Sequence, residues 1–427
     1  MLKYLGVITT LLFTSFYIFP FEPAIMPSIN VKMLLACLSF PLILIQSAKK
    51  GKFKIPKDIV VIFLYSLPIT LFSWVSNVYN NTYDYSFNYY FVSIFVWMGA
   101  GYVVVNLMSL VHSGVSARLV ANYLIGVCCI QCILALIASY NPAVNEALDG
   151  MMASGGEAFM GDTGERMHGL GCALDVAGGR FAAVLLMIAY LLTVAKTKFE
   201  IYCYIIAFFI IAVIGNMIGR TTTIGVMLSF AYWAYDTCFR KSTKKEYIWH
   251  FGGLLLLVLI PLIVVLYNTN GVFYQNLRFG FEGFFSLVEN GKWQTGSNDI
   301  LKNMVVFPDN MKTWIIGDGY GANPANDPHY IGPSYHGFYM GTDIGYLRFI
   351  FFFGLLGMFS MIMILYCYCS LLWTRFCEYK NMIFMIFVLN LIIWFKVTSD
   401  LLPVFAIFLC VTKEEHDEYE ERLTFND

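Results

Sequence analysis

The chain has 427 residues, of which 59% are hydrophobic, 17% are aromatic and only 13% are charged. This apolar fraction exceeds what the core of a soluble domain uses, so the composition indicates a membrane protein and excludes an ordinary soluble enzyme. The formal net charge of −1 gives no support to a nucleic-acid partner, because such a partner requires a basic surface.

Long apolar runs predict an all-α, polytopic integral membrane protein. A helix that spans the bilayer needs about 20 mostly apolar residues, and residues 1–427 are expected to form a single membrane domain with about twelve such helices. The runs lie near residues 4–20, 29–46, 58–76, 88–111, 119–139, 176–195, 200–218, 221–238, 249–267, 344–371, 382–396 and 400–411. The first run lacks a small-residue cleavage site after it, so it is predicted to be a helix rather than a signal peptide.

Basic residues concentrate in alternate connections between these runs, including 49–57, 196–198 and 240–245. By the positive-inside rule, these connections face the cytoplasm. Both termini are therefore predicted to be cytoplasmic. The acidic tail at 412–427 is expected to be solvated and partly disordered, because it is highly charged and carries few apolar residues.

Two connections on the outer side are long enough to be functional: an outer loop at 141–175 and a large outer loop at 268–343. In the larger one, apolar residues of 272–291 recur at helical intervals, which predicts an amphipathic helix at the membrane surface or over a cavity. Ser297 is predicted to cap a second short helix. The large outer loop is thus expected to be structured.

The cysteines give no sign of a disulfide framework or a metal site. Ten of the eleven, all but Cys172, lie in predicted spans or at their cytoplasmic ends, where cysteine behaves as a small hydrophobic residue. The run "CCIQC" at 128–132 lies in the middle of a span and is predicted to pack in the core. No histidine spacing matches a known metal motif, so no metal and no cofactor are expected.

Arginines are enriched on the predicted outer side, where the positive-inside rule cannot explain them. Five of the nine arginines lie there: Arg166, Arg180, Arg220, Arg278 and Arg348. A guanidinium group binds phosphate oxygens through two parallel hydrogen bonds, so the pattern predicts an anionic ligand at the outer interface. The alternative for each arginine is that it reaches lipid phosphates or caps helix carbonyls.

Charges near the ends of the spans sharpen this prediction. Arg220 lies between two spans with almost no loop, where a charge at membrane depth needs a partner. Arg180 follows Asp175 by five residues, a poor spacing for a helical pair, so a third group is expected to join them. Arg348 has no acidic residue three or four positions away, so we expect an anionic group from outside its helix to pair with it. Asp343 either stabilises the helix dipole or takes part in chemistry.

Three histidines, His168, His329 and His336, also lie on the predicted outer side. An imidazole there can act as a base near neutral pH.

Four blocks of sequence resemble the O-antigen polymerases, members of the polymerase and ligase superfamily that handles polysaccharides on undecaprenyl diphosphate. The blocks are "ERMHGLGCALDVAGGRF" (165–181), "GRTTTIG" (219–225), "IIGDGYG" (315–321) and "TDIGYLRFIFFFGLLG" (342–357). Their order and their positions relative to the spans are similar to those of the family. The first five spans resemble it only in hydropathy.

The resemblance implies a GT-C-like membrane glycosyltransferase with its active site on the outer face, working without a metal, a cofactor or a sugar nucleotide. Arg166 and Arg220 match the arginines associated with binding of the lipid diphosphate. Asp343 stands where the related ligases place a histidine, which fits a polymerase better than a ligase. The candidate catalytic residues are Asp343, His336 and Arg220. The candidate substrate-binding residues are Arg166, Arg180, Arg278, Arg348 and His168.

The implied activity is polymerisation of undecaprenyl-diphosphate-linked repeat units into O-antigen or capsular polysaccharide at the outer face of the bacterial inner membrane. The expected partners are the lipid bilayer, the lipid-linked glycans, a chain-length regulator and a flippase. Two alternatives stay open. A surface-polymer ligase would use the same donor with another acceptor, and a lipid-linked oligosaccharide flippase or transporter would typically contain related halves with broken helices.

Overall fold

The computed structural model describes residues 2–51, 56–153, 166–239, 245–324, 327, 329–335 and 337–425. Within these residues the chain forms helices and isolated bridges but no β-strand, which confirms the all-α prediction. The first helices are α1 (Leu2–Ile18), α2 (Val31–Lys50), α3 (Lys57–Asn80), α4 (Tyr90–His112), α5 (Ala117–Tyr140), α6 (Pro142–Met151), α8 (Leu174–Thr193), α9 (Lys198–Ile218) and α10 (Thr222–Phe239). The later helices are α11 (Lys245–Thr269), α12 (Gly271–Gly280), α13 (Glu282–Asn290), α14 (Gly296–Asn303), α15 (Met311–Ile315), η2 (Tyr339–Gly341), α16 (Gly345–Arg375), η3 (Cys377–Tyr379), α17 (Lys380–Ile393), α18 (Leu402–Leu409) and α19 (Lys413–Phe425).

Several of these helices are long and apolar enough to cross a membrane. In the described part of the chain, seven meet this condition: α2, α3, α4, α5, α8, α9 and α16. The α11 and α12 helices add an eighth if they form one span that is bent by 118° between Thr269 and Gly271. The structure is therefore that of a polytopic membrane protein. The other predicted runs form α1, α10, α17 and α18, which are 17, 18, 14 and 8 residues long.

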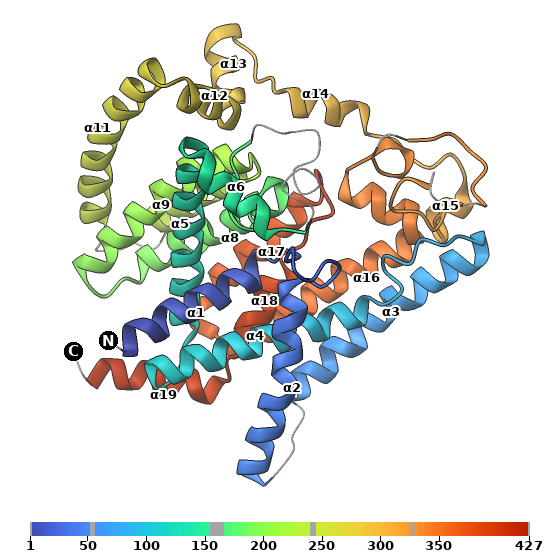
Figure 1. The fold of residues 1–427 in the computed structure, drawn as a ribbon, viewed down its shortest axis with the longest axis horizontal. Coiled ribbons are helices and arrows are strands. Elements are labelled where there is room, and N and C mark those ends of the chain that lie inside the picture. Colours follow the sequence, from blue (N-terminus) through green and yellow to red (C-terminus); the bar gives the residue numbers. More distant parts are fainter. Residues whose placement is uncertain are drawn as a thin grey trace.

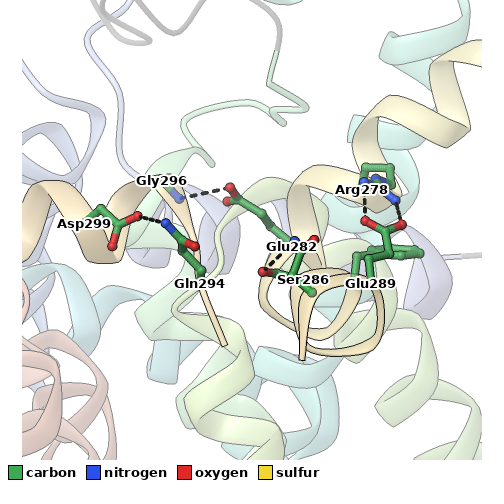
Figure 2. Close-up of a pocket in the computed structure, with 9 residues that line it drawn as sticks. Arg278, Glu282, Ser286, Glu289, Gln294, Gly296 and Asp299 are labelled. Carbon is green, nitrogen blue, oxygen red and sulfur yellow. Dashed lines mark hydrogen bonds and ion pairs between the residues drawn. The ribbon is translucent and has the colours of Figure 1, made fainter. Parts of the chain in front are cut away.

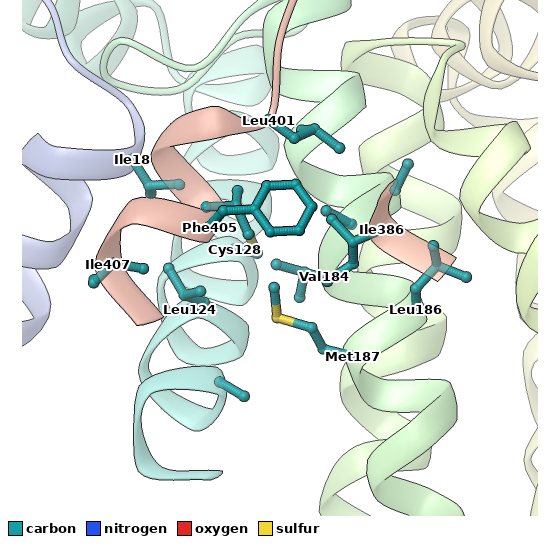
Figure 3. Close-up of a cluster of buried hydrophobic side chains, with 14 of the residues drawn as sticks. Ile18, Leu124, Cys128, Val184, Leu186, Met187, Ile386, Leu401, Phe405 and Ile407 are labelled. Atoms are coloured by element: carbon teal, nitrogen blue, oxygen red, sulfur yellow. The ribbon is translucent and has the colours of Figure 1, made fainter. Parts of the chain in front are cut away.

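Helix α8 forms the centre of the molecule. Every side chain from Ala177 to Leu192 is buried, as expected for a helix that is apolar on all sides. Its side chains meet those of α5, α17 and α18 in the cluster shown in Figure 3, where Val184 and Met187 lie near Cys128 and Phe405. The prediction that the "CCIQC" run packs in the core is confirmed for Cys128, which is fully buried without a disulfide partner.

Helices at the periphery expose large apolar side chains. Phe40 on α2, Leu64 on α3 and Leu257 on α11 are all more than half exposed. An exposed apolar surface of this kind needs a nonaqueous partner. It fits contact with the lipid bilayer.

The glycine-rich segment 315–321 packs against a break in α16. Gly354 has a φ of +70° and interrupts the helix, which frees carbonyl groups one turn earlier. The Asp318 N–H donates to the Phe351 carbonyl at 2.6 Å, and the Gly319 N–H donates to the Phe352 carbonyl at 3.0 Å. The segment thus satisfies the backbone groups that the break exposes.

The large outer loop is structured, as predicted, but its helices differ in detail. The single amphipathic helix expected at 272–291 is two helices, α12 and α13, that meet at Phe281. Thr295, rather than Ser297, caps α14, because its side chain accepts a hydrogen bond from the Asn298 N–H at 3.1 Å. Figure 1 shows α12, α13 and α14 along one end of the molecule, far from both termini.

The acidic tail is ordered over residues 413–425, where it forms α19. The prediction of partial disorder is wrong for this part. The α19 helix lies beside the N-terminal end of the molecule in Figure 1. His416 anchors it, being only 4% exposed and 2.7 Å from the Glu378 carboxylate. The charge pattern of the tail does not predict this anchor, which is a buried histidine with a polar partner.

Candidate functional site

A cavity of about 140 Å³ lies where several helices end below α12 and α14, and we call it the arginine cavity. It joins three of the predicted site residues: Arg166, Arg220 and Asp343. The complete lining is Arg166, Leu174, Asp175, Gly219, Arg220, Phe279, Ser297, Ile300, Leu301, Met304, Asp343 and Lys396. Residues from well-separated parts of the chain therefore meet at one point.

A close backbone contact brings α8 to the junction between α9 and α10. A Cβ atom on Gly219 would lie 2.4 Å from the Leu174 carbonyl oxygen, and one on Gly178 would lie 3.0 Å from the Gly219 carbonyl oxygen. Only glycine allows such an approach at both positions. The contact places Asp175, at the start of α8, beside Arg220.

Asp175 and Lys396 form an ion pair across the cavity wall. The Thr221 hydroxyl donates a hydrogen bond to the same Asp175 carboxylate. Lys396 also donates to the Thr221 hydroxyl at 3.3 Å. The network joins the ends of α8, α10 and α17, so it holds the Lys396 ammonium at a fixed place in the wall.

Arg166 and Arg220 lie over the same aromatic ring. Their guanidinium carbons are 4.6 Å and 4.4 Å from the ring centroid of Phe279. Arg220 forms an ion pair with Glu282 of α13, whereas Arg166 forms no hydrogen bond or ion pair with any other residue that the structure describes. Burial and the neighbouring Arg220 cation lower the pKa of Arg166. Of these two neighbouring guanidinium groups only Arg220 has a carboxylate partner in the described part of the chain, which favours binding of an added anion.

Asp343 lies just before α16 and is held by Arg348. The Arg348 Nη1 atom is 3.4 Å from the Asp343 Oδ1 atom and donates to the Thr398 hydroxyl at 2.9 Å. Its guanidinium also covers the Phe338 ring at 3.5 Å. Burial raises the pKa of Asp343 to about 6, although the Arg348 cation acts in the opposite direction. The carboxyl is thus a proton acceptor poised near neutral pH.

The structure places the other predicted residues outside the arginine cavity. Arg348 lies behind Asp343 and positions it. Arg180 is buried within α8, 5.7 Å from the Phe19 ring, and Asp175 pairs with Lys396 instead of sharing a third group with Arg180.

Two more predicted residues lie in other surroundings. His168 is buried, with its Nε2 atom 3.6 Å from the Asp149 carboxylate. Arg278 pairs with Glu289 at a second cavity. His336 lies outside the residues that the structure describes.

Sequence reasoning missed Lys396 and Phe279, which line the arginine cavity, and Glu282, which pairs with Arg220 from outside the lining. Lys396 did carry a signal, because a lysine at the outer end of a predicted span departs from the positive-inside rule. Phe279 and Glu282 looked like ordinary members of an amphipathic helix, and only the packing of α12 and α13 over the cavity identifies them.

In the part of the chain that the structure describes, no group of three or more His, Cys, Asp or Glu side chains is arranged to hold a metal ion. The arginine cavity instead combines three cationic side chains with two carboxyl groups. Chemically, it can bind an anion at Arg166 and Arg220 and accept a proton at Asp343.

Comparison of the chain with protein-family models, with curated proteins and with solved structures finds no match. The function therefore has to be inferred from the residues of the chain itself.

Proposed function

We propose that this chain polymerises undecaprenyl-diphosphate-linked oligosaccharide repeat units into O-antigen or capsular polysaccharide. The reaction takes place at the outer face of a bacterial inner membrane, in a GT-C-like fold of about twelve spans with both termini in the cytoplasm, and it uses no metal. The observation that carries the proposal is the arginine cavity, which is lined by Arg166, Arg220 and Lys396 together with Asp343.

The two arginines bind the diphosphate of the donor. Arg166 has no acidic partner among the described residues, and Arg220 exchanges its ion pair with Glu282 for phosphate oxygens. A guanidinium group forms two parallel hydrogen bonds to phosphate. Because the diphosphate gains negative charge as it departs, these contacts strengthen in the transition state and lower the barrier.

Asp343 acts as the general base toward the acceptor. A hydroxyl oxygen of the acceptor sugar forms a bond to the anomeric carbon of the donor glycan. The bond from that carbon to the diphosphate oxygen breaks, and its electron pair leaves with the diphosphate. The proton of the hydroxyl passes to the Asp343 carboxylate, so charge and atoms balance. Arg348 is a positioning residue, because its contact with Asp343 at 3.4 Å fixes the carboxyl group.

The test is complementation of a strain of the source bacterium from which this chain has been deleted. We expect the wild-type chain to restore a ladder of surface polysaccharide, and Arg220→Ala to leave single-repeat product. We expect Arg220→Lys to restore little of the ladder, because lysine keeps the charge but loses the paired hydrogen bonds. Arg422→Lys, at the opposite end of the molecule, is the matched control and should restore the full ladder.

Each variant is compared at equal amounts in the membrane. A normal ladder from both Arg220 variants would remove the diphosphate role of this arginine. If the deletion strain still polymerises, the polymerase assignment is wrong. If the wild-type chain instead transfers finished polymer to a different acceptor, the chain is a ligase.

A further inference from the structure

A second and larger cavity lies beside the arginine cavity, and we call it the polar cavity. Its volume is about 380 Å³, within the range of about 300–1,000 Å³ typical of small-ligand sites. It is formed by α12, α13, the link to α14 and the start of α14. Figure 2 shows Glu282, Ser286 and Glu289 reaching into it from α13 and Asp299 from α14.

The polar cavity offers the groups that a polyhydroxyl ligand needs. Ser286, Asn290 and Gln294 supply both donors and acceptors of hydrogen bonds, and the carboxylates add acceptors. Sugar hydroxyl groups are both donors and acceptors, so a lining of this mixed kind matches them better than a purely cationic or apolar one.

The two cavities share a wall. One Glu282 carboxylate oxygen pairs with Arg220 of the arginine cavity, and the other accepts a hydrogen bond from the Gly296 N–H at 2.9 Å in the polar cavity. Gly296 lines the polar cavity and the next residue, Ser297, lines the arginine cavity. A ligand that places its diphosphate on Arg220 therefore has the polar cavity next to it.

Carboxylates outnumber cations in the lining of the polar cavity. Three carboxylates, from Glu282, Glu289 and Asp299, face one guanidinium, from Arg278. Glu289 binds Arg278 through both of its oxygens, so that cation is already neutralised. Glu282 pairs with Arg220 and Asp299 with Lys302. None of these cations is free to receive the charge of an acidic sugar, which disfavours its binding.

We propose that the polar cavity binds the glycan part of the lipid-linked substrate and selects neutral or amino sugars over acidic ones. This inference rests on the proposed function, since it assigns the sugar site next to the diphosphate site. The oligosaccharide hydrogen-bonds to Asn290, Gln294 and Ser286, which line the cavity.

The test measures binding of the full-length protein in lipid nanodiscs to an array of neutral, amino-sugar and acidic oligosaccharides. We expect neutral or amino-sugar glycans to bind. Asn290→Ala and Gln294→Ala should each weaken that binding about three- to tenfold, the value of one lost hydrogen bond. Asn303→Ala, an exposed residue of α14 outside the lining, is the matched control and should bind as the wild type does.

Absence of any bound glycan, preference for acidic glycans, or equal binding by the Asn290 and Gln294 variants would overturn the inference. If glycans bind in this way while the complemented strain forms no ladder, the polymerase proposal alone fails. If the ladder depends on Arg220 but no glycan binds in the polar cavity, the glycan site alone fails.

Discussion

Asp343 and Arg348 are five residues apart, yet they form one unit at the start of α16. The helix begins at Gly345, so the carboxyl lies before the first turn and Arg348 reaches back to it at 3.4 Å. Arg348 also donates to Thr398 at 2.9 Å, which ties the pair to the segment after α17. The arginine therefore has its anionic partner within its own chain, and Asp343 is the group that faces the cavity.

The pH dependence of the reaction follows from Asp343. Burial raises the pKa of Asp343 to about 6, so the carboxyl is protonated below that pH and ionised above it. A general base must be ionised to accept a proton. We therefore expect kcat/KM to fall about tenfold for each pH unit below about 6, measured with the purified protein and a lipid-linked repeat unit.

The variant Asp343→Asn should lower the rate by about 10²- to 10⁴-fold, the usual contribution of a general base. It should also remove the acidic limb of the pH profile. Asp309→Asn, an exposed residue of the same outer loop, is the control and should keep both the rate and the profile. An acidic limb that persists in Asp343→Asn would assign the base to another residue.

At the scale of elements, the site depends on how closely α8 approaches the α9–α10 junction. Helix α8 carries Asp175 and the junction carries Arg220, and the two meet because Gly178 and Gly219 have no side chain. Lys396 then joins Asp175 from the end of α17. These contacts have a sequence separation of more than 40 residues, so no local pattern reports them.

A methyl group at Gly219 should separate these elements. In Gly219→Ala the new Cβ would lie 2.4 Å from the Leu174 carbonyl oxygen, and the φ of −153° at this position is open to alanine, so the effect is steric. We expect a loss of about 1–3 kcal/mol in stability from overpacking and loss of most polymer, measured by thermal unfolding and by the surface-polysaccharide ladder.

Gly271→Ala is the comparison, because nothing lies within 4 Å of a Cβ added there. It should leave both the unfolding temperature and the ladder unchanged. Equal behaviour of the two alanine variants would mean that the approach of α8 to the junction does not set the geometry of the site.

At the scale of the whole molecule, the candidate site and the termini lie at opposite ends (Figure 1). The α19 helix closes the end that carries the termini. His416 accepts a hydrogen bond from the Ala117 N–H at 3.3 Å and contacts the rings of Phe376 and Tyr379. The tail thus joins the start of α5 to the end of α16, and its role is structural.

Removal of the His416 side chain should weaken the fold without changing the chemistry. His416→Ala leaves the Ala117 N–H without its partner and removes two ring contacts, so we expect a loss of about 1–3 kcal/mol, read as a lower thermal unfolding temperature. The activity of each folded molecule should be unchanged, because the arginine cavity is at the other end. Asp417→Ala, exposed on the same helix, should unfold like the wild type; an equal drop in both would show that α19 stabilises by charge alone.

The sequence by itself determined that the chain is an all-helical membrane protein, because a run of about 20 apolar residues has one stable form in a bilayer. It also singled out Arg220, Arg348 and Asp343, since charges at the ends of apolar runs are costly and need a reason, and Arg166 as one of five arginines on the predicted outer side. Only the tertiary structure decided which of the predicted charges share a cavity. Arg180 resembles Arg220 in the sequence, yet packing places it against Phe19. Lys396 and Phe279 reach the cavity, and Glu282 reaches Arg220, through contacts between distant helices. Such contacts depend on backbone approach and side-chain direction, which no local spacing encodes.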